Sequence, residues 1–571
     1  MTDKTEQEHD ERALPLAPEI TLHENDDDLA VKLGWRSWMV VFVACFVIMT
    51  QVFVVTAAGS VLAFIEADIG DASIGGWIIQ GPLLMQSVLS PIIGRLSDVL
   101  DRKYLASVPP LIAFIGAVVS ARATSMSMLI GGGVLIGVTL STISIIQAIP
   151  AEVLPLKYRA LANGFAFLGG AVAGLAGGIG AGAVTNMSSS GWRNIFWMQA
   201  AFHATSTIGL FAFYHPHKSD YPKMKLKEYI WTCDPIGSTM FISSTTLILL
   251  ALDWAGGTYA WSSLEVALPL AFGLALLLVF CVYEWKGRDD GLVAHVFFRG
   301  SPNFALSIFA FSVEGWIFYS AVNTITPQVV LYLGFESTSW MISVRQLSYT
   351  IVALVASIPI TLYATRYKDL KSPLLFTFAL FLAVTIAYAN IKPSWSSAQY
   401  VLNVICGIGQ AGPLTLLVAC VQFTAPHAFL STATGLAFSA RAIGGAFGSA
   451  VLDAIVDGKL GSIYDSRVTA AAESAGLPSS QVAALLATIS SGEAAAYAAV
   501  ADMDATIWNA AITASHDAYA AAYRLAWVSI VPFVVLAIVA VACLRGVKDL
   551  MTDKVEASVE VAEVVVEEKG V

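Results

Sequence analysis

From Trp38 to Arg545 the chain alternates long apolar runs with short polar segments. About 20 apolar residues, at a rise of 1.5 Å per residue, match the roughly 30 Å hydrocarbon core of a bilayer. The pattern therefore predicts an all-α membrane protein with fourteen transmembrane helices. We place these spans at residues 38–58, 77–94, 105–121, 127–150, 161–184, 194–214, 234–252, 263–283, 303–326, 340–363, 373–391, 398–423, 431–456 and 525–545.

Two of these spans depart from the simple pattern. The span 105–121 contains Pro109 and Pro110, and the apolar run that begins at 303 continues past Pro327 to Leu333. Proline is tolerated in spanning helices because neighbouring helices and water can satisfy the freed carbonyl group. We therefore keep both segments as spans.

Composition agrees with this interpretation. The chain is 57% hydrophobic and 13% charged, and its mean hydropathy is +0.71. A soluble chain of 571 residues could not bury so much apolar surface in ordinary domain cores. The first 33 residues are polar, so we expect no cleavable signal peptide and expect the first span to direct insertion.

The distribution of lysine and arginine predicts the orientation. With the N-terminus inside, the inner loops hold fifteen basic residues, whereas the short outer loops hold only Arg122, Arg193 and Lys392. Cytoplasmic loops carry an excess of basic residues, so both termini are predicted to be cytoplasmic. An even number of spans also requires both ends to lie on one side. We expect a multi-pass protein of the plasma membrane.

The spacing of the spans predicts two related halves. Residues 38–214 and 303–545 each hold six spans, and the halves become nearly equal in length when the outer insertion 457–524 is set aside. A connector, 215–302, carries two further spans. This 6 + 2 + 6 plan predicts two six-helix bundles that expose a central site alternately to each side. The tails, 1–37 and 546–571, are expected to be disordered, and the insertion to form short amphipathic helices over the outer mouth or a flexible loop.

The loop between the second and third spans reads Gly94-Arg-Leu-Ser-Asp98, followed by Asp101, Arg102 and Lys103. It resembles the signature of the major facilitator superfamily, a glycine–x–leucine–x–aspartate core before a basic end, with Asp101 in place of the second glycine. Gly94 allows a neighbouring helix to approach, and Asp98 and Arg102 can form charge-assisted hydrogen bonds. The resemblance implies an inner gate that stabilises the outward-facing state.

The fifth span carries glycines at every fourth position, which favour close helix packing in lipid. We predict a packing ridge formed by Gly170, Gly174, Gly178 and Gly182. The segment from Gly174 to Gly178 is similar to the antiporter motif of proton-coupled drug exporters, with Leu175 where proline is usual. Generic helix packing explains it equally well. The arginine-centred motif often seen in span four is absent, because 129–140 carries no charge.

Several longer segments narrow the resemblance. They are Gly191-Trp-Arg-Asn-Ile-Phe-Trp197, Phe213-Tyr-His-Pro216, Asp234-Pro-Ile-Gly237 and Arg441-Ala-Ile-Gly-Gly-Ala-Phe-Gly448. Together with the large insertion before the last span, they resemble the fourteen-span fungal trichothecene efflux pump family, which is allied to the siderophore–iron transporters. The resemblance covers about residues 35–545.

Ionisable groups in the hydrocarbon are costly and become functional candidates by default. Glu314 lies near the middle of span nine among apolar and aromatic residues. Because apolar surroundings disfavour the charged form of a carboxyl group, Glu314 is a candidate for proton uptake and release in each cycle. The alternative is a structural acid paired with an arginine. Arg441, in span thirteen, could bind Glu314 or cargo, or could hold the helix packing beside Gly444 and Gly445.

Other polar side chains in the spans are weaker candidates. Arg345 could belong to the pathway or extend to the outer surface, and His203 could titrate near neutral pH or serve only in packing. An amphipathic cavity could be lined by Gln51, Gln80, Gln86, Gln147, Gln410, Trp77, Trp316, Tyr319 and Tyr349. An interfacial aromatic girdle competes as the explanation for Trp77.

Several functional classes lack any signal. The sequence has no GxxxxGK[ST] segment, no metal-ligand cluster and no catalytic triad spacing, so we expect neither an ATP-driven pump nor an enzyme, and no cofactor or metal. It has no basic patch for nucleic acid. The six cysteines are scattered and are expected to be packing residues. Asn186 begins a sequon on a predicted outer loop and is a possible glycosylation site.

The sequence therefore predicts a monomeric transporter whose partners are a small molecule, protons and the lipid bilayer. The resemblance favours proton-coupled export of a trichothecene-like fungal toxin or other secondary metabolite. Proton-coupled uptake of ferric siderophores is the first alternative, and a broad multidrug exporter is the second. A receptor or a membrane enzyme is disfavoured by the gate motif and by the missing catalytic residues.

Overall fold

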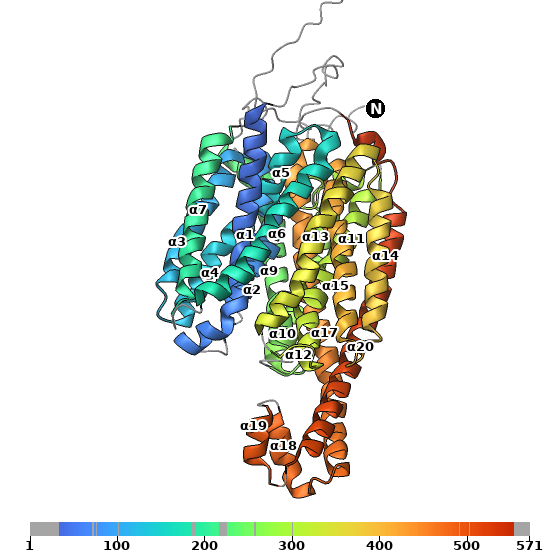
Figure 1. Ribbon diagram of the computed structural model, residues 1–571. Helices are drawn as coiled ribbons and strands as arrows, with labels where there is room; N and C mark the ends of the chain where they lie inside the picture. Colours follow the sequence, from blue (N-terminus) through green and yellow to red (C-terminus); the bar gives the residue numbers. More distant parts are fainter. Residues whose placement is uncertain are drawn as a thin grey trace, which may run out of the picture.

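The computed structural model describes most of the chain as long helices that run side by side (Figure 1). The described residues are 34–70, 74–75, 77–100, 102–185, 190–215, 225–255, 259–299, 301–337, 339–489, 492–501 and 503–552. Most of the tails that were predicted to be disordered, residues 1–33 and 553–571, lies outside these ranges, but residues 35–37 are helical and begin the first helix. Residues 546–552 are described, and they include a short 3-10 turn, Lys548–Leu550.

The described part of the first half forms seven α-helices. They are α1 (Trp35–Ile69), α2 (Trp77–Val99), α3 (Arg102–Ala121), α4 (Met126–Leu140), α5 (Ile143–Val153), α6 (Arg159–Thr185) and α7 (Arg193–Phe213). A turn at 141–142 divides the predicted span 127–150 into α4 and α5. Helix α3 accommodates both Pro109 and Pro110, as expected for a helix with helical neighbours.

A two-helix bridge follows. The short α8 (Leu226–Thr232) leads to α9 (Pro235–Trp254) and α10 (Leu264–Lys286), which pack against each other. Helix α9 also contacts α2 and α17, so the bridge lies against helices from both halves. The connector after α10 contains the 3-10 turn η4 (His295–Phe298).

The second half begins with a helix that changes its winding. The order is α11 (Asn303–Gly315), the π-helix η5 (Trp316–Ile325), α12 (Thr326–Tyr332), α13 (Ser339–Tyr367), α14 (Lys371–Tyr388), α15 (Ser396–Ala411), α16 (Pro413–Thr424), η6 (His427–Phe429), α17 (Leu430–Ser474), α18 (Val482–Thr488), α19 (Glu493–Ala499) and α20 (Ala505–Ala542). The three elements from α11 to α12 form one continuous membrane-length segment, so the apolar run past Pro327 belongs to the same span.

The predicted all-α membrane fold is confirmed. Thirteen segments of the described chain are long and apolar enough to cross a membrane, and they coincide with thirteen of the predicted spans. The remaining predicted span, 194–214, is helix α7, which is less apolar because it carries Gln199, His203 and Ser206. All six cysteines are free.

The helices gather into two groups that meet at one end (Figure 1). Helices α1–α7 form one group and α11–α17 with α20 form the other, and the largest hydrophobic core lies in the second group. The first and last described residues, 34 and 552, lie at the same end, where Lys157 N–H donates to the Thr552 carbonyl at 2.8 Å. We call this end of the bundle the tail end.

The insertion 457–524 projects from the opposite end of the bundle (Figure 1). Helices α17 and α20 extend far beyond the predicted spans, to Ser474 and from Ala505, and α18 and α19 complete the projecting unit. Its own small apolar core includes Val468, Leu485 and Ile507. The insertion is therefore helical as expected, but long helices carry it away from the bundle.

The predicted glycine ridge on α6 needs correction. A Cβ atom on Gly169 would collide with the Cys45 carbonyl of α1, and one on Gly177 would collide with the Thr56 hydroxyl. Gly170 would make only an ordinary contact at 3.7 Å, and Gly174 faces open space. The surroundings of Gly178 and Gly182 lie outside the described residues. The glycine spacing correctly identified α6 as a helix that packs closely. However, α1 contacts the face of α6 that carries Gly169 and Gly177, which is displaced by one residue from the predicted ridge.

Candidate functional site

A buried charge cluster occupies the middle of the second half. The carboxylate of Glu314, on α11, accepts hydrogen bonds from Arg441 Nε at 2.5 Å and Nη2 at 3.0 Å. Gln410 Nε2, on α15, donates to Glu314 Oε1 at 2.5 Å, and Arg441 Nη1 donates to the Tyr319 hydroxyl at 2.8 Å. Glu314 is fully buried and Arg441 is 5% exposed. The suggested pairing of Arg441 with Glu314 is confirmed, and Gln410 and Tyr319, which were predicted only as cavity residues, belong to the same contact group.

Aromatic rings complete the setting of Arg441. Its guanidinium carbon lies 4.7 Å from the ring centres of both Phe318 and Tyr319, and 5.6 Å from that of Phe311. Rings at these distances attract the cation through their quadrupoles. The guanidinium group of Arg441 therefore pairs with one carboxylate and is surrounded by several aromatic rings. These contacts compensate the loss of its hydration.

Glycines of α17 allow α11 and η5 to approach this closely. A Cβ atom on Gly444 would collide with Ser312, one on Gly445 would lie 2.5 Å from the Tyr319 ring, and one on Gly448 would collide with Trp316. Trp316 is 5% exposed and packs on Phe447 and Phe533. The predicted cavity residue Trp316 thus lies in a packed helix contact.

The π-helix η5 begins two residues after Glu314. Each π turn contains an extra residue compared with the α-helix, so it changes which side chains face α17. The winding brings Tyr319 to Arg441 although these residues are 122 positions apart in the chain. π-Helical turns occur frequently at functional sites. No feature of the apolar pattern predicted this change in winding.

The superfamily-like motif joins the two halves at the tail end. Asp98, on α2, accepts hydrogen bonds from Ser431 N–H at 3.1 Å, Thr432 N–H at 2.8 Å and Thr432 Oγ1–H at 2.7 Å. These donors form the first turn of α17, where free N–H groups and the helix dipole favour an anion. A Cβ atom on Gly94 would collide with the Ser431 carbonyl. Gly94 and Asp98 therefore hold α2 against the start of α17.

Arg102 stabilises this contact from within the first half. Its Nη2 lies 2.8 Å from Asp98 Oδ1, and its Nη1 pairs with Glu152 at the end of α5. Arg102 is 4% exposed and Glu152 is 2% exposed. Lys103 follows on the same turn of α3 and is half-buried. Glu152 was missed by sequence reasoning, because an acidic residue at the end of an apolar run resembles an ordinary interfacial charge.

A second contact between the halves lies beside the motif. Arg159 Nη1 donates to the Gln422 carbonyl at 2.6 Å, and Asn163 Nδ2 donates to Gln422 Oε1 at 2.9 Å. Gln147 Nε2 in turn donates to Asn163 Oδ1 at 2.8 Å. Gln147, predicted to line a cavity, is therefore part of a buried amide chain that links α5 and α6 to α16. Asn163 and Gln422 carried no sequence signal.

His203 and Gln51 remain within the first half. Gln199 Nε2 lies 2.7 Å from His203 Nε2 and donates to the Thr50 carbonyl of α1 at 2.9 Å. Gln51 Nε2 donates to the Thr139 carbonyl at 2.7 Å. Both His203 and Gln51 are fully buried. They lie in helix contacts apart from the Glu314 cluster.

Arg345 is also enclosed. It is 3% exposed, and its Nη2 pairs with Glu336 Oε1 at 2.7 Å. Its Nη1 donates to the Ser396 carbonyl at 2.8 Å and to Gln399 Oε1 at 3.1 Å. Arg345 therefore does not extend to the outer surface. It joins α13 to the start of α15 at the end opposite the tails.

The segment 191–197, which contributed to the resemblance, forms polar contacts between helix ends in the first half. Trp192 is fully buried, and its Nε1 donates to Asp68 Oδ2 at 2.9 Å, while Arg193 Nη1 lies 2.6 Å from the same oxygen. Arg193 also donates to the Ala123 carbonyl at 3.0 Å. The hydrogen bonds from Arg193 and Trp192 lower the pKa of Asp68 below its ordinary value. They join the ends of α1, α3 and α7. The sequon residue Asn186 lies outside the described residues.

Curated relatives of this chain are transporters. It is 25% identical over 431 residues to the MFS-type transporter ucsD of Acremonium sp, covering 74% of this chain and 71% of that one. It is 24% identical over 523 residues to the trichothecene efflux pump TRI12 of Fusarium sporotrichioides, covering 88% and 85%. A 28% identical match to the Acremonium transporter pydD spans only 44% of each chain.

Solved structures show the same fold at low identity. The proton:xylose symporter XylE, in a double tryptophan mutant, aligns with a TM-score of 0.53 at 12% identity over 90% of this chain and 98% of that one. The human organic anion transporter MFSD10 aligns with a TM-score of 0.51 at 13% identity over 86% and 99%. The model of the Major Facilitator Superfamily matches residues 41–449. This chain is therefore a multi-pass membrane transporter that belongs to the Major Facilitator Superfamily.

Proposed function

We propose that this transporter exports a small oxygenated secondary metabolite, of trichothecene-like type, in exchange for protons. The observation that carries the proposal is that α17 holds both the tail-end contact with Asp98 and the ion pair with Glu314. Thr432 and Arg441 are nine residues apart, which is about 14 Å along one helix. A change at the ion pair can therefore act on the contact between the halves.

Protonation of Glu314 supplies such a change. A neutral carboxyl group no longer compensates the buried guanidinium of Arg441, and an uncompensated buried charge is strongly unfavourable. A protonated Glu314 also no longer offers an ionised carboxylate to hydroxyl groups of a cargo molecule, so binding of the proton weakens binding of the cargo. Proton and cargo thereby compete for one cluster, which is the requirement for exchange.

The proposed orientation places the tail end in the cytoplasm of the cell, at the plasma membrane. Basic loop residues favour this side. The hydrogen bonds that Asp98 and Arg159 form between the halves lie at the tail end, so this conformation corresponds to a transporter closed toward the cytoplasm. In the proposal, residues 38–214 and 303–545 are the two moving bodies of a monomer, and 215–302 bridges them.

Names of relatives support export over uptake. They include the trichothecene efflux pump TRI12, the efflux pump FUS6 and a transporter of the acurin A biosynthesis cluster, each 24–25% identical. Uptake of ferric siderophores is the alternative, because the same machinery runs in either direction under a suitable gradient. A broad multidrug exporter would use the same cluster with a less selective cavity.

Transport into proteoliposomes tests the proposal. With the full-length protein and an imposed pH gradient, a trichothecene should move against the proton flux, whereas a ferric siderophore should not. Glu314→Gln should abolish coupled movement while the protein remains folded, and Glu265→Gln, an exposed acid on α10, should have no effect. Full proton-coupled flux in Glu314→Gln would remove this residue from the mechanism, and siderophore flux alone would favour uptake.

A further inference from the structure

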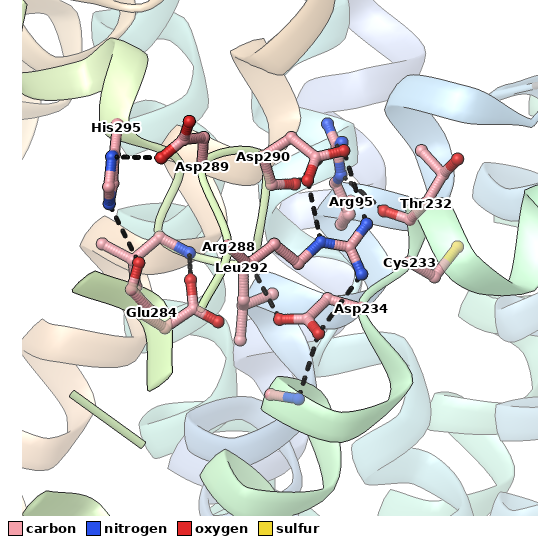
Figure 2. A network of polar contacts seen from close by, with 12 residues as sticks. Arg95, Thr232, Cys233, Asp234, Glu284, Arg288, Asp289, Asp290, Leu292 and His295 are labelled. Carbon is pink, nitrogen blue, oxygen red and sulfur yellow. Dashed lines mark hydrogen bonds and ion pairs between the residues drawn. The ribbon is translucent and has the colours of Figure 1, made fainter. Parts of the chain in front are cut away.

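A second buried charge cluster lies at the tail end of the two-helix bridge (Figure 2). It contains Asp234 just before α9, Glu284 in the last turn of α10, and Arg288 just after it. Asp234 is fully buried, Glu284 is 4% exposed and Arg288 is 7% exposed. Asp234 and Gly237 belong to a sequence segment that the proposed transport cycle does not use.

Asp234 is held by several donors. It adopts a left-handed backbone conformation, with φ of 48°, and its Oδ1 accepts from Gly237 N–H at 3.1 Å, which caps α9. The Tyr283 hydroxyl donates to the same oxygen at 3.1 Å, and Arg288 Nη1 lies 3.5 Å from it. Among the described residues, Oδ2 accepts a single long hydrogen bond, 3.4 Å, from Leu292 N–H. The charge of Arg288 thus compensates Asp234.

Glu284 has a different setting. Its Oε2 accepts from Val293 N–H at 2.8 Å, whereas the buried Oε1 has no hydrogen-bond donor among the described residues. A Cβ atom on Gly237 would lie 2.5 Å from Glu284 Oε1 and would collide with Asp234 Oδ2, and one on Gly291 would collide with Glu284 Oε2. The two glycines leave just enough space for both carboxyl groups. Glu284 Oε1 and Asp234 Oδ2 both lie next to the position of that Gly237 Cβ atom, so the two carboxyl groups are neighbours.

The cationic side chains near this cluster bind groups other than the Glu284 carboxylate. Arg288 also bonds to Asp290, through Nε at 2.8 Å and Nη2 at 3.4 Å. His295 binds the main-chain carbonyl of Glu284 and the carboxylate of Asp289, which is 79% exposed. In the described part of the chain, the Glu284 carboxyl group has no lysine, arginine or histidine within ion-pair distance.

Two ionised carboxylates are acceptors only, so they cannot bond to each other, and their repulsion is large where water is excluded. One proton between them converts repulsion into a hydrogen bond. We propose that Glu284 and Asp234 share a proton, which is carried on Glu284 Oε1 and donated to Asp234 Oδ2. The site is a proton-binding site in the bridge, separate from Glu314.

This acid pair is connected to the contact between the halves. Arg95, on α2, donates from Nε to the Thr232 carbonyl at 3.1 Å and from Nη2 to the Asp290 carbonyl at 3.3 Å. Its guanidinium also lies 4.3 Å from the ring centre of Phe429, just before α17, and Phe297 of the connector packs on the same ring. The segments that carry the acid pair thus bind α2 and the start of α17 together.

When the shared proton is lost, the two carboxylates repel each other. This repulsion separates the segment before α9, which carries Asp234, from the end of α10 and its connector, which carry Glu284 and Arg288. The anchors of Arg95 lie in these two segments, next to Asp234 and Arg288. Other titratable groups beside them are the thiol of Cys233, the hydroxyl of Tyr283 and the carboxylate of Asp290. The bound proton therefore stabilises the closed tail end. A rise in pH on this side favours its opening.

Infrared spectroscopy of the full-length protein in lipid nanodiscs tests the proton site. With carbon-13-labelled glutamate, a protonated glutamate band should be present at neutral pH, disappear in Glu284→Gln and persist in Glu265→Gln. Persistence of the complete band in Glu284→Gln overturns the assignment. If that variant does not fold, absence of any protonated glutamate band in the wild-type protein overturns it equally. Neither result depends on transport, so it leaves the proposed function untouched.

Distance measurements test the connection to the tail end. Spin labels at Tyr104 and Tyr367, which are 56% and 63% exposed, report on the separation of the halves once the exposed Cys281 and Cys543 are replaced by serine. The closed population should fall as pH rises in the otherwise unchanged protein but not in Glu284→Gln. An identical pH response in Glu284→Gln would refute the connection.

Discussion

Replacement of Asp98 by asparagine tests the contact that closes the tail end. The carboxylate accepts three hydrogen bonds from the first turn of α17, at 3.1, 2.8 and 2.7 Å. An asparagine of the same shape retains one acceptor oxygen and turns an NH₂ group toward the remaining donors. It also removes the anion from the positive end of the helix dipole.

The expected magnitude follows from the hydrogen bonds that this substitution weakens. Hydrogen bonds to a charged group contribute about 1.5–3 kcal/mol each, but water replaces part of this when the tail end opens. A net loss of about 2–3 kcal/mol is expected, which shifts the ratio of closed to open protein by roughly 30- to 150-fold. Asp98 and Arg102 both belong to the first half, so their ion pair is present in the closed and in the open protein. It therefore does not contribute to the free-energy difference between the two states.

Spin labels at Tyr104 and Tyr367 provide the assay, since the closed and open populations give separate distances. Asp98→Asn should reduce the closed population strongly, and Asp549→Asn, an exposed acid at the same end, should leave it unchanged. An unaltered distance distribution in Asp98→Asn would show that the helix-capping contact does not set the equilibrium.

Three further predictions concern other contacts. Gly315→Ala should destabilise the protein by more than the roughly 1–3 kcal/mol typical of overpacking, because its Cβ would collide with a main-chain carbonyl of α17, and thermal unfolding in detergent should show it. Asp68, whose pKa is lowered chiefly by its hydrogen bond from Arg193, contributes stability above the ordinary pKa of about 3.9 that is lost as pH falls through its folded value. Asp68→Asn should flatten this acidic limb of the melting curve, and an unchanged limb would assign it to other groups. Asn163→Ala should remove the side-chain link to Gln422 and lower the ratio of closed to open protein by about tenfold, while an unchanged ratio would mean that the buried amide chain is only structural.

The positions of the spans were predictable because they depend on local composition. Each helix must satisfy its own backbone hydrogen bonds in lipid and present a long apolar surface. Both properties depend on about 20 consecutive residues. Pro109 and Pro110 did not interrupt α3, and the span from 303 extended to Tyr332 as its apolar run indicated. The gate motif was equally local, since Gly94, Asp98 and Arg102 lie within nine consecutive residues at the end of α2 and the start of α3.

The partners of buried groups were not predictable in this way. Arg441 was named as a possible partner of Glu314 because each is costly in lipid, and this pairing is confirmed, but its bidentate geometry depends on two helices 127 residues apart. Gln147 was expected beside a cavity and lies instead in an amide chain between the halves. The functional roles of these residues stay predictions.

The sequence by itself determined that this chain is a helical membrane protein, where its membrane-length segments lie, and which few charges lie in lipid. Only the tertiary structure decided which face of α6 meets α1, where α11 becomes a π-helix, and that Glu284 faces Asp234. The physical reason is the range of the forces. Transfer into lipid acts on each segment separately, whereas close packing and charge pairing depend on atoms that the fold brings together from distant parts of the chain.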